Sequence, residues 1–213
     1  MHIPDGILPL PVTLAGYAAS AGVVAWCLHK ISQRGDPRES IPKAALLAAA
    51  FFVASLIQIP IPPASVHLVL GGLLGVVLGY FAFPAILVAL FFQAVMFGHG
   101  GLTTLGVNGI TLGFPALLAA FMFRLYARAP NPGKARAALF GFVAGVGATA
   151  LSVALFALFL FYTIPAHLDA ALERSAIFTL VLVHVPVVAI DGMVTAFAVS
   201  YLAQARPRLL GSL

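Results

Sequence analysis

The sequence has very little charge. Only 8% of its 213 residues are Asp, Glu, Lys or Arg, whereas 62% are hydrophobic. A soluble domain carries about 25% charged residues, so this chain has too few polar side chains to cover a soluble fold. The composition therefore predicts an integral membrane protein. The net charge of +5 does not indicate nucleic-acid binding, because the cations lie in short gaps between apolar runs.

Cysteine and an N-terminal positive region are also nearly absent. The single cysteine, Cys27, excludes an intrachain disulfide and a cysteine-based metal cluster. No lysine or arginine precedes Lys30, so the start does not look like a signal peptide, and we expect the first residues to be retained. An ATP-binding loop is missing too, because Ala135 follows Gly133-Lys134 where Ser or Thr is required.

What the chain does have is a series of apolar runs, most of them about as long as a transmembrane helix. We therefore predict an all-α integral membrane protein, a compact bundle of seven transmembrane helices that forms a single domain over residues 1–213. The expected spans are about 8–28, 44–58, 67–81, 83–97, 107–126, 137–162 and 177–202.

The cations follow the first, fifth and seventh runs. The positive-inside rule places these segments in the cytoplasm, so we expect the N-terminus outside and the C-terminus inside. Of eleven cations, only Arg174 falls on the other side. The cytoplasmic group is Lys30, Arg34, Arg38, Lys43, Arg124, Arg128, Lys134, Arg136, Arg206 and Arg208.

The histidines show the opposite distribution. In this topology only His29 is cytoplasmic. One explanation is chance, since histidines are common in loops. The other is function, because ionisable residues at membrane depth are usually functional and neutral imidazole is the commonest transition-metal ligand. The outer histidines are His2, His67, His99, His167 and His184.

The first two residues are the sharpest local signal. A free Met1 amine, the His2 amide nitrogen and the His2 imidazole can chelate a metal in one plane and leave a fourth position open. Such geometry suits Ni(II) or Cu(II), and Co(II) can be forced into it; His67 is the imidazole best placed to close the square. Residues 4–6, Pro-Asp-Gly, have turn chemistry that would fold the terminus back into the bundle. The alternative is that the Met-His start binds nothing.

Four motifs in order resemble the substrate-capture M components of energy-coupling-factor nickel and cobalt importers, the CbiM/NikM family. They are Met1–Gly6, Ser65–Gly72, Gly98–Gly106 with Asn108, and His184-Val185-Pro186 with Asp191-Gly192. The family often has glutamate where this chain has Asp191, so that match is looser. The resemblance implies that Met1, His2 and His67 supply the metal ligands, with the N-terminal segment inside the bundle beneath the outer loops.

The resemblance also suggests four residues that orient a ligand or hold a loop shut, namely Asp5, Ser65, His99 and Asn108. Plainer roles compete with these. Asp5 could cap a turn or helix start and His99 could be a hydrated loop residue. Ser65 and Asn108 could cap the third and fifth spans.

His184 and Asp191 are seven residues apart and share one helix face. They are either an intramembrane polar pair that relays protons or a hydrogen-bonded pair that locks the helix near Pro186. For Gln93, in the fourth run, we expect a contact between helices rather than a metal ligand.

The function implied by the resemblance is capture of Co(II) or Ni(II) as transported substrate in the plasma membrane of a prokaryote. Such a protein is a transport subunit, not an enzyme, and has no organic cofactor. It needs a transmembrane coupling subunit and two ATPase subunits, with or without a small accessory membrane subunit. The alanine-rich second run, residues 44–58, predicts a close-approach face for the coupling subunit.

Three alternatives belong to other classes. One is a self-sufficient, proton-coupled secondary metal transporter that uses His184 and Asp191. Another is a membrane metalloenzyme, which is disfavoured because four protein nitrogens leave no open position for a substrate. The last is a structural membrane protein without transport activity. Cobalt and nickel both accept the proposed ligands.

Overall fold

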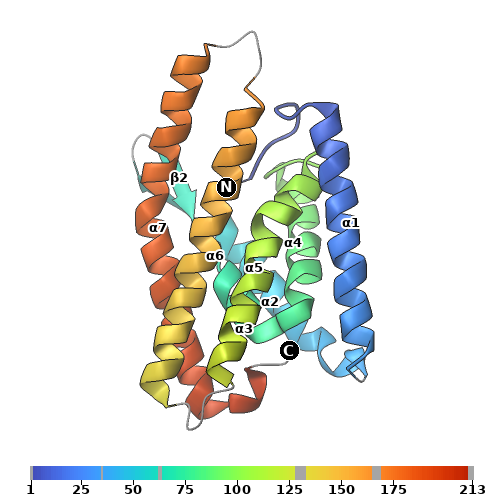
Figure 1. Ribbon diagram of the computed structural model, residues 1–213, viewed down its shortest axis with the longest axis vertical. Helices are drawn as coiled ribbons and strands as arrows, with labels where there is room; N and C mark the ends of the chain where they lie inside the picture. Colours follow the sequence, from blue (N-terminus) through green and yellow to red (C-terminus); the bar gives the residue numbers. More distant parts are fainter. Residues whose placement is uncertain (1, 35, 62–63, 128–132, 165–168, 211–213) are drawn as a thin grey trace.

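The protein is a helical bundle with one small hairpin (Figure 1). This computed structural model describes residues 2–34, 36–61, 64–127, 133–164 and 169–210. Its helices are α1 (Leu10–Ser32), α2 (Ile41–Leu56), α3 (Gly71–Leu78), α4 (Ala82–Phe97), α5 (Leu105–Ala127), α6 (Lys134–Tyr162) and α7 (Ala170–Ala205). Short 3-10 turns are η1 (Pro37–Glu39), η2 (Gly79–Phe81) and η3 (Pro207–Leu209), and the strands are β1 (Gln58–Ile61) and β2 (Ala64–His67).

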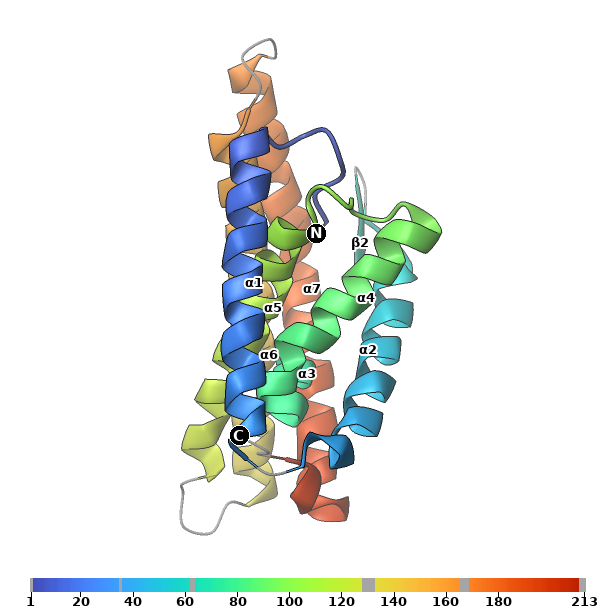
Figure 2. The same ribbon diagram turned by 90° about the vertical axis from the view of Figure 1, so that its right-hand side faces the viewer.

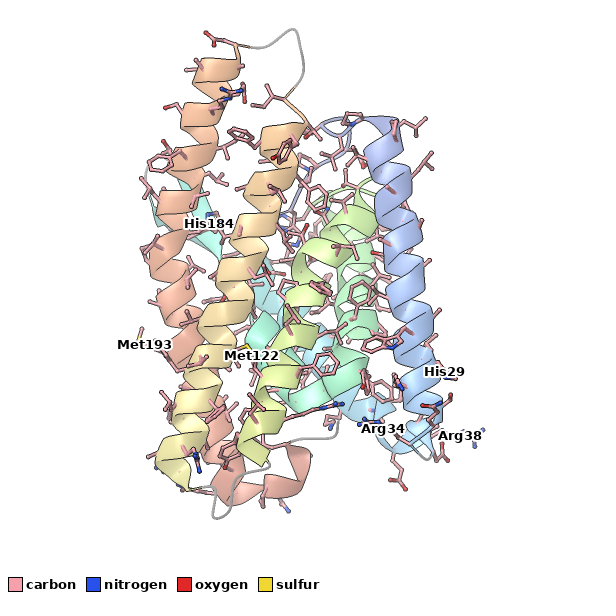
Figure 3. The ribbon with its side chains drawn as sticks, in the orientation of Figure 1. His29, Arg34, Arg38, Met122, His184 and Met193 are labelled. Carbon is pink, nitrogen blue, oxygen red and sulfur yellow. The ribbon has the colours of Figure 1, made fainter. Side chains whose placement is uncertain are left out.

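The two ends of the bundle differ in what they carry. Residues 2–9, the hairpin and residues 98–104 all lie in the upper half of Figures 1 and 2. Figure 3 shows His29, Arg34 and Arg38 together at the lower end. Arg34 and Arg38, which follow α1, therefore lie at the opposite end of the bundle from the N-terminal segment.

The helices are long enough for a multi-pass membrane protein, but they are not seven full spans. Within the described residues, five stretches have the length and hydropathy to cross a membrane: α1, Gly71–Phe97, Leu105–Tyr126, α6 and α7. Helix α2 has 16 residues and α3 only 8. Eight residues of helix rise about 12 Å, less than half of a hydrocarbon core about 30 Å thick. The expected helical membrane architecture is confirmed, whereas the third run is not a full transmembrane helix.

The third run does not begin as a helix, which corrects the prediction of a span over 67–81, because its first residue, His67, is the last residue of β2. Strands β1 and β2 pair in an antiparallel sense, with Gln58 opposite His67 and Ile59 opposite Val66. The chain then stays non-helical until Gly71. Residues 59–66 lie between two predicted spans and contain three prolines, which argue against a strand, so the sequence pattern did not indicate this strand pair.

Glycines let α3, α6 and α7 approach closely. A methyl group on Gly72 of α3 would lie 2.5 Å from the Cα atom of Gly145 in α6. A methyl group on Gly145 would lie 2.8 Å from the carbonyl oxygen of Asp191 and 2.9 Å from the Cα atom of Gly192, both in α7. Small residues are the usual means of close helix packing in membranes. Here they bring Asp191 beside the start of α3.

Candidate metal site

The N-terminal segment is docked against the start of α5. Ile3 is fully buried, and its amide donates to Oδ1 of Asn108 at 2.9 Å. Nδ2 of Asn108 donates back to the Ile3 carbonyl at 3.0 Å, and the Thr104 hydroxyl donates to the same carbonyl at 2.6 Å. Asn108 therefore pairs with Ile3 much as a neighbouring strand would, and does not cap α5. These bonds fix the backbone next to His2.

Asp5 ties the same segment to the loop before α5. Its carboxylate accepts from the amides of Leu102 at 3.2 Å and Thr103 at 2.8 Å, and from the Thr103 hydroxyl at 2.5 Å. The hydrogen bonds from Thr103 hold the pKa of Asp5 below its usual value. Gly101 faces Asp5 so closely that a Cβ atom there would overlap the carboxylate. The glycine in this loop is therefore a requirement of the docked terminus.

Three imidazoles converge next to this docked segment. His2, His67 and His99 each offer a ring nitrogen such that the three nitrogens lie within 4.8 Å of one another. The ring centroids are 5.0 Å apart for His2 and His67, 4.3 Å for His2 and His99, and 5.5 Å for His67 and His99. They come from three separate segments: the N-terminus, β2 and the loop after α4.

The site favours neutral imidazoles. Burial lowers the pKa of His2 well below its usual value, lowers the pKa of His67 to about 3, and lowers that of His99. Both ring nitrogens of His2 and Nε2 of His99 are buried without a hydrogen-bond partner in the described part of the chain. Buried polar atoms are seldom left unpaired, and neutral imidazole is the form that binds metal. The donor set fits a transition-metal ion.

His67 is held at the end of β2, and its side chain is 6% exposed. Nδ1 lies 3.2 Å from the carbonyl oxygen of Leu68. When Nδ1 carries the proton for that contact, Nε2 holds the lone pair that a metal needs. A second group that sets the tautomer is typical of histidine ligands.

His184 and Asp191 are both buried, but no hydrogen bond joins them, which corrects the idea of a directly bonded pair. His184 Nδ1 lies 2.7 Å from the carbonyl oxygen of Leu180 in its own helix. Asp191 instead accepts from the amides of Val69 and Leu70 and from the Thr149 hydroxyl. Figure 3 shows His184 on α7 at the level of β2.

Gln93 joins two helices, as predicted. Its Nε2 donates to the Phe52 carbonyl at 3.3 Å and to the Ser55 hydroxyl, both in α2. Its other side-chain atom, Oε1, is buried without a hydrogen-bond partner among the described residues. The Gln93 side chain also lies near His2 and raises the pKa of that histidine, against the larger lowering caused by burial. It therefore borders the imidazole cluster as well as linking α2 to α4.

The other residues singled out in the sequence are His99, Ser65, Met1 and His167. His99 lies in the loop after α4 and is partly exposed, but its Nε2 is buried beside His2. The backbone of Ser65 belongs to β2. The role proposed for the Ser65 side chain, like those of Met1 and His167, lies outside the part of the chain that the structure describes.

Sequence reasoning missed three threonines. Thr103 and Thr104 bind Asp5 and Ile3, and both lie in the glycine-rich motif that drew attention only to His99 and Asn108. Thr149 donates to Asp191 at 2.9 Å. It sits within the long apolar run of α6, where no local pattern marks it.

The fold and the site define a multi-pass membrane protein with a cluster of histidines that could hold a metal ion. This class is consistent with the inner membrane of a prokaryote. Its family follows from comparison: residues 2–209 match the model of CbiM, the cobalt uptake substrate-specific transmembrane region. The chain belongs to this family, which confirms the resemblance drawn from its four motifs.

Individual relatives agree with that assignment. The chain is 34% identical over 215 residues to a putative metal transport protein of Haemophilus influenzae, covering 99% of this chain and 97% of the relative. It is 34% identical over 223 residues to the fused nickel transport protein NikMN of Rhodobacter capsulatus, covering 99% of this chain and 64% of that longer protein. The fold resembles the crystal structure of a transition metal transporter, with a TM-score of 0.75 and 24% identity over 96% of this chain and 93% of the other.

Proposed function

We propose that this protein captures Co(II) or Ni(II) from outside the cell as the substrate-binding subunit of an ATP-driven importer of the energy-coupling-factor class. The ligands are the Met1 amine, the backbone and imidazole nitrogens of His2, and the imidazole of His67. The observation that carries the proposal is the convergence of three imidazoles, with His67 buried, beside a docked N-terminal segment. The names of the relatives, which include both a nickel transporter and the cobalt-uptake family itself, support this choice of metals.

The ring orientations support a plane that contains His2 and His67. These two rings are inclined by only 34°, whereas His99 is inclined by 61° to His2 and by 70° to His67. In this chelate the His2 amide nitrogen lies between the Met1 amine and the His2 imidazole, so the His67 imidazole lies opposite that amide nitrogen and next to the His2 imidazole. Metal–nitrogen bonds of about 2.0–2.1 Å place two such neighbouring nitrogens about 2.9 Å apart. The imidazole nitrogens lie within 4.8 Å of each other, so the two rings must move closer when the ion binds. His99 then covers the site from outside the plane.

The decisive experiment is titration of the purified protein with Ni(II) and Co(II), beside a version with one residue added before Met1. We expect tight binding by the unextended protein, a yellow diamagnetic nickel complex, and loss of binding in the extended version because the amine is displaced. His2→Ala and His67→Ala should each abolish tight binding. His29→Ala, at the opposite end of α1, is the matched control. Wild-type affinity after the extension would contradict the chelate.

Uphill import also needs an energy source, and we propose a transmembrane coupling subunit and two ATPase subunits. The sequence has no ATP-binding loop of its own. Support for a docking face comes from α2 and α4, which border an apolar cavity of about 360 Å³. Alanines 45, 48 and 49 line its α2 side, and such small residues permit close helix approach.

This docking face is tested by filling the cavity. Ala48→Leu should reduce co-purification with the coupling subunit while the isolated chain still binds nickel with wild-type affinity. Ala50→Leu is the control, because Ala50 is exposed on the same helix and is not among the residues that line the cavity. If both variants co-purify with the coupling subunit in the same yield as the wild-type protein, the contact does not involve this cavity.

The alternative, a proton-coupled secondary transporter, requires His184 and Asp191 to relay protons. Their hydrogen bonds to other partners argue against a direct relay between them. Metal uptake into vesicles that contain this chain alone, with collapse on addition of an uncoupler, would support that alternative over the importer.

A further inference from the structure

Asp191 is a buried carboxylate on α7 whose partners lie near the proposed metal ligand. Its side chain is 1% exposed. Oδ2 accepts from the Val69 amide at 3.1 Å and the Thr149 hydroxyl at 2.9 Å, and Oδ1 accepts from the Leu70 amide at 3.4 Å. Every described hydrogen bond of this carboxylate therefore leads either to α6 or to the link between β2 and α3.

That link begins at His67. Val69 and Leu70 follow the histidine by two and three residues, and Leu70 directly precedes the first residue of α3. Leu70 has a φ of +52°, the only positive φ of a non-glycine residue in the described chain. Leucine seldom adopts this conformation. The surrounding structure must impose it, and the two amides held by Asp191 are the visible means.

The Asp191 carboxylate is also favourably placed at the N-terminus of α3. The first amides of α3 have no partner within the helix, and a negative charge near a helix N-terminus is favourable. Asp191 therefore stabilises a helix that starts inside the bundle, where lipid and water cannot satisfy its backbone. The same contact sets where the preceding strand ends.

A second contact holds β2 to α7 on the other side of His67. Val66 is buried in a cluster with Val183 and Val187 of α7. The histidine is thus bracketed by an apolar contact one residue before it and polar contacts two and three residues after it. Both contacts are with the same helix.

We infer that Asp191 is a positioning residue of the metal site, which holds the backbone of residues 69–70 on α7 and thereby fixes the imidazole of His67. This inference rests on the proposed capture of nickel or cobalt. It gives Asp191 a role through backbone geometry, without contact to the metal and without proton transfer to His184.

The test compares Asp191→Asn with wild-type protein in nickel affinity, in the optical spectrum of the nickel complex, and in thermal unfolding of the metal-free protein. The variant keeps the size of the side chain but replaces one acceptor oxygen with a donor. We expect a 10- to 100-fold loss of nickel affinity, the range typical of groups that orient a ligand, together with a changed spectrum. Thr195→Val is the matched control, because Thr195 lies one turn further along α7 with a buried hydroxyl that has no partner among the described residues.

The outcomes separate this inference from the function on which it rests. If wild-type protein binds neither Ni(II) nor Co(II), the proposed function fails and the inference fails with it. If wild-type protein binds nickel and Asp191→Asn lowers only the unfolding temperature, with affinity and spectrum unchanged, Asp191 is structural and the inference alone is overturned. If Asp191→Asn does not fold, Thr149→Val, which removes one bond to the carboxylate, decides: an altered nickel spectrum supports the inference, and a wild-type spectrum overturns it.

Discussion

Asn108 and Ile3 form a reciprocal pair of hydrogen bonds, in which one carboxamide satisfies both backbone groups of a fully buried residue. The pair joins positions 105 residues apart in the chain. It lies next to His2, so the backbone that carries the proposed chelate is fixed before a metal arrives.

Replacing Asn108 with Asp should therefore weaken metal capture. The variant keeps an oxygen for the Ile3 amide but sets a second oxygen against the Ile3 carbonyl. Loss of a buried hydrogen bond costs about 1–3 kcal/mol, so nickel affinity should fall roughly 5- to 150-fold in a calorimetric titration. Thr111→Val is the control, because the Thr111 hydroxyl is buried in the same helix and donates to the Val107 carbonyl of that helix, not to the N-terminal segment. A wild-type affinity in Asn108→Asp would show that docking of Ile3 does not limit binding.

His99 should matter less than His67. We place His99 over the site and not in the ligand plane, so His99→Ala should lower nickel affinity by less than about tenfold, below the about 10- to 100-fold loss typical of groups that orient a ligand. The nickel complex should stay diamagnetic. Loss of binding as complete as that in His67→Ala, measured by equilibrium dialysis, would instead make His99 a ligand.

Gly101→Ala should displace the N-terminal segment. The added methyl group overlaps the Asp5 carboxylate and comes within 2.6 Å of the Asp5 amide nitrogen. We expect a loss of nickel affinity of at least tenfold and faster proteolysis near the N-terminus, since the bonds to Leu102 and Thr103 are disturbed. Gly22→Ala has open space around the new methyl group and should leave both measurements unchanged. Equal behaviour of the two variants would count against a tightly docked terminus.

Acid should destabilise the metal-free protein. In the folded state burial lowers the pKa of His67 to about 3, whereas an unfolded histidine has a pKa near 6.5. Between these values the unfolded chain binds a proton that the folded chain does not, so stability falls as the pH falls below about 6.5. The slope is about 1.4 kcal/mol per pH unit for one such group.

Thermal unfolding between pH 7.5 and pH 5 measures this effect. His67→Gln removes the titrating group, so its unfolding temperature should depend less steeply on pH. A slope in the variant equal to that of the wild-type protein would mean that His67 is protonated at the same pH in both states.

The sequence predicted the helical membrane architecture because length and hydropathy of the apolar runs are set by the bilayer. It also singled out His2, His67 and His99, which the structure brings together. The pairing of residues 58–61 with residues 64–67 was missed, because residues 59–66 lie between two predicted spans and contain three prolines, which argue against a strand. The partners of Asp191 were missed for another reason: Val69, Leu70 and Thr149 are far from it in the chain and carry no local signal.

The contacts around the site also divide the residues that line it into two parts, here called two bodies. Residues 2–5 are bonded to residues 102–108, whereas His67 is held between contacts to α7. The seam between these bodies runs between His2 and His67, the two imidazoles assigned to the metal. A motion that separates these two parts of the wall also separates His2 from His67, so opening of the metal site and release of the ion occur together.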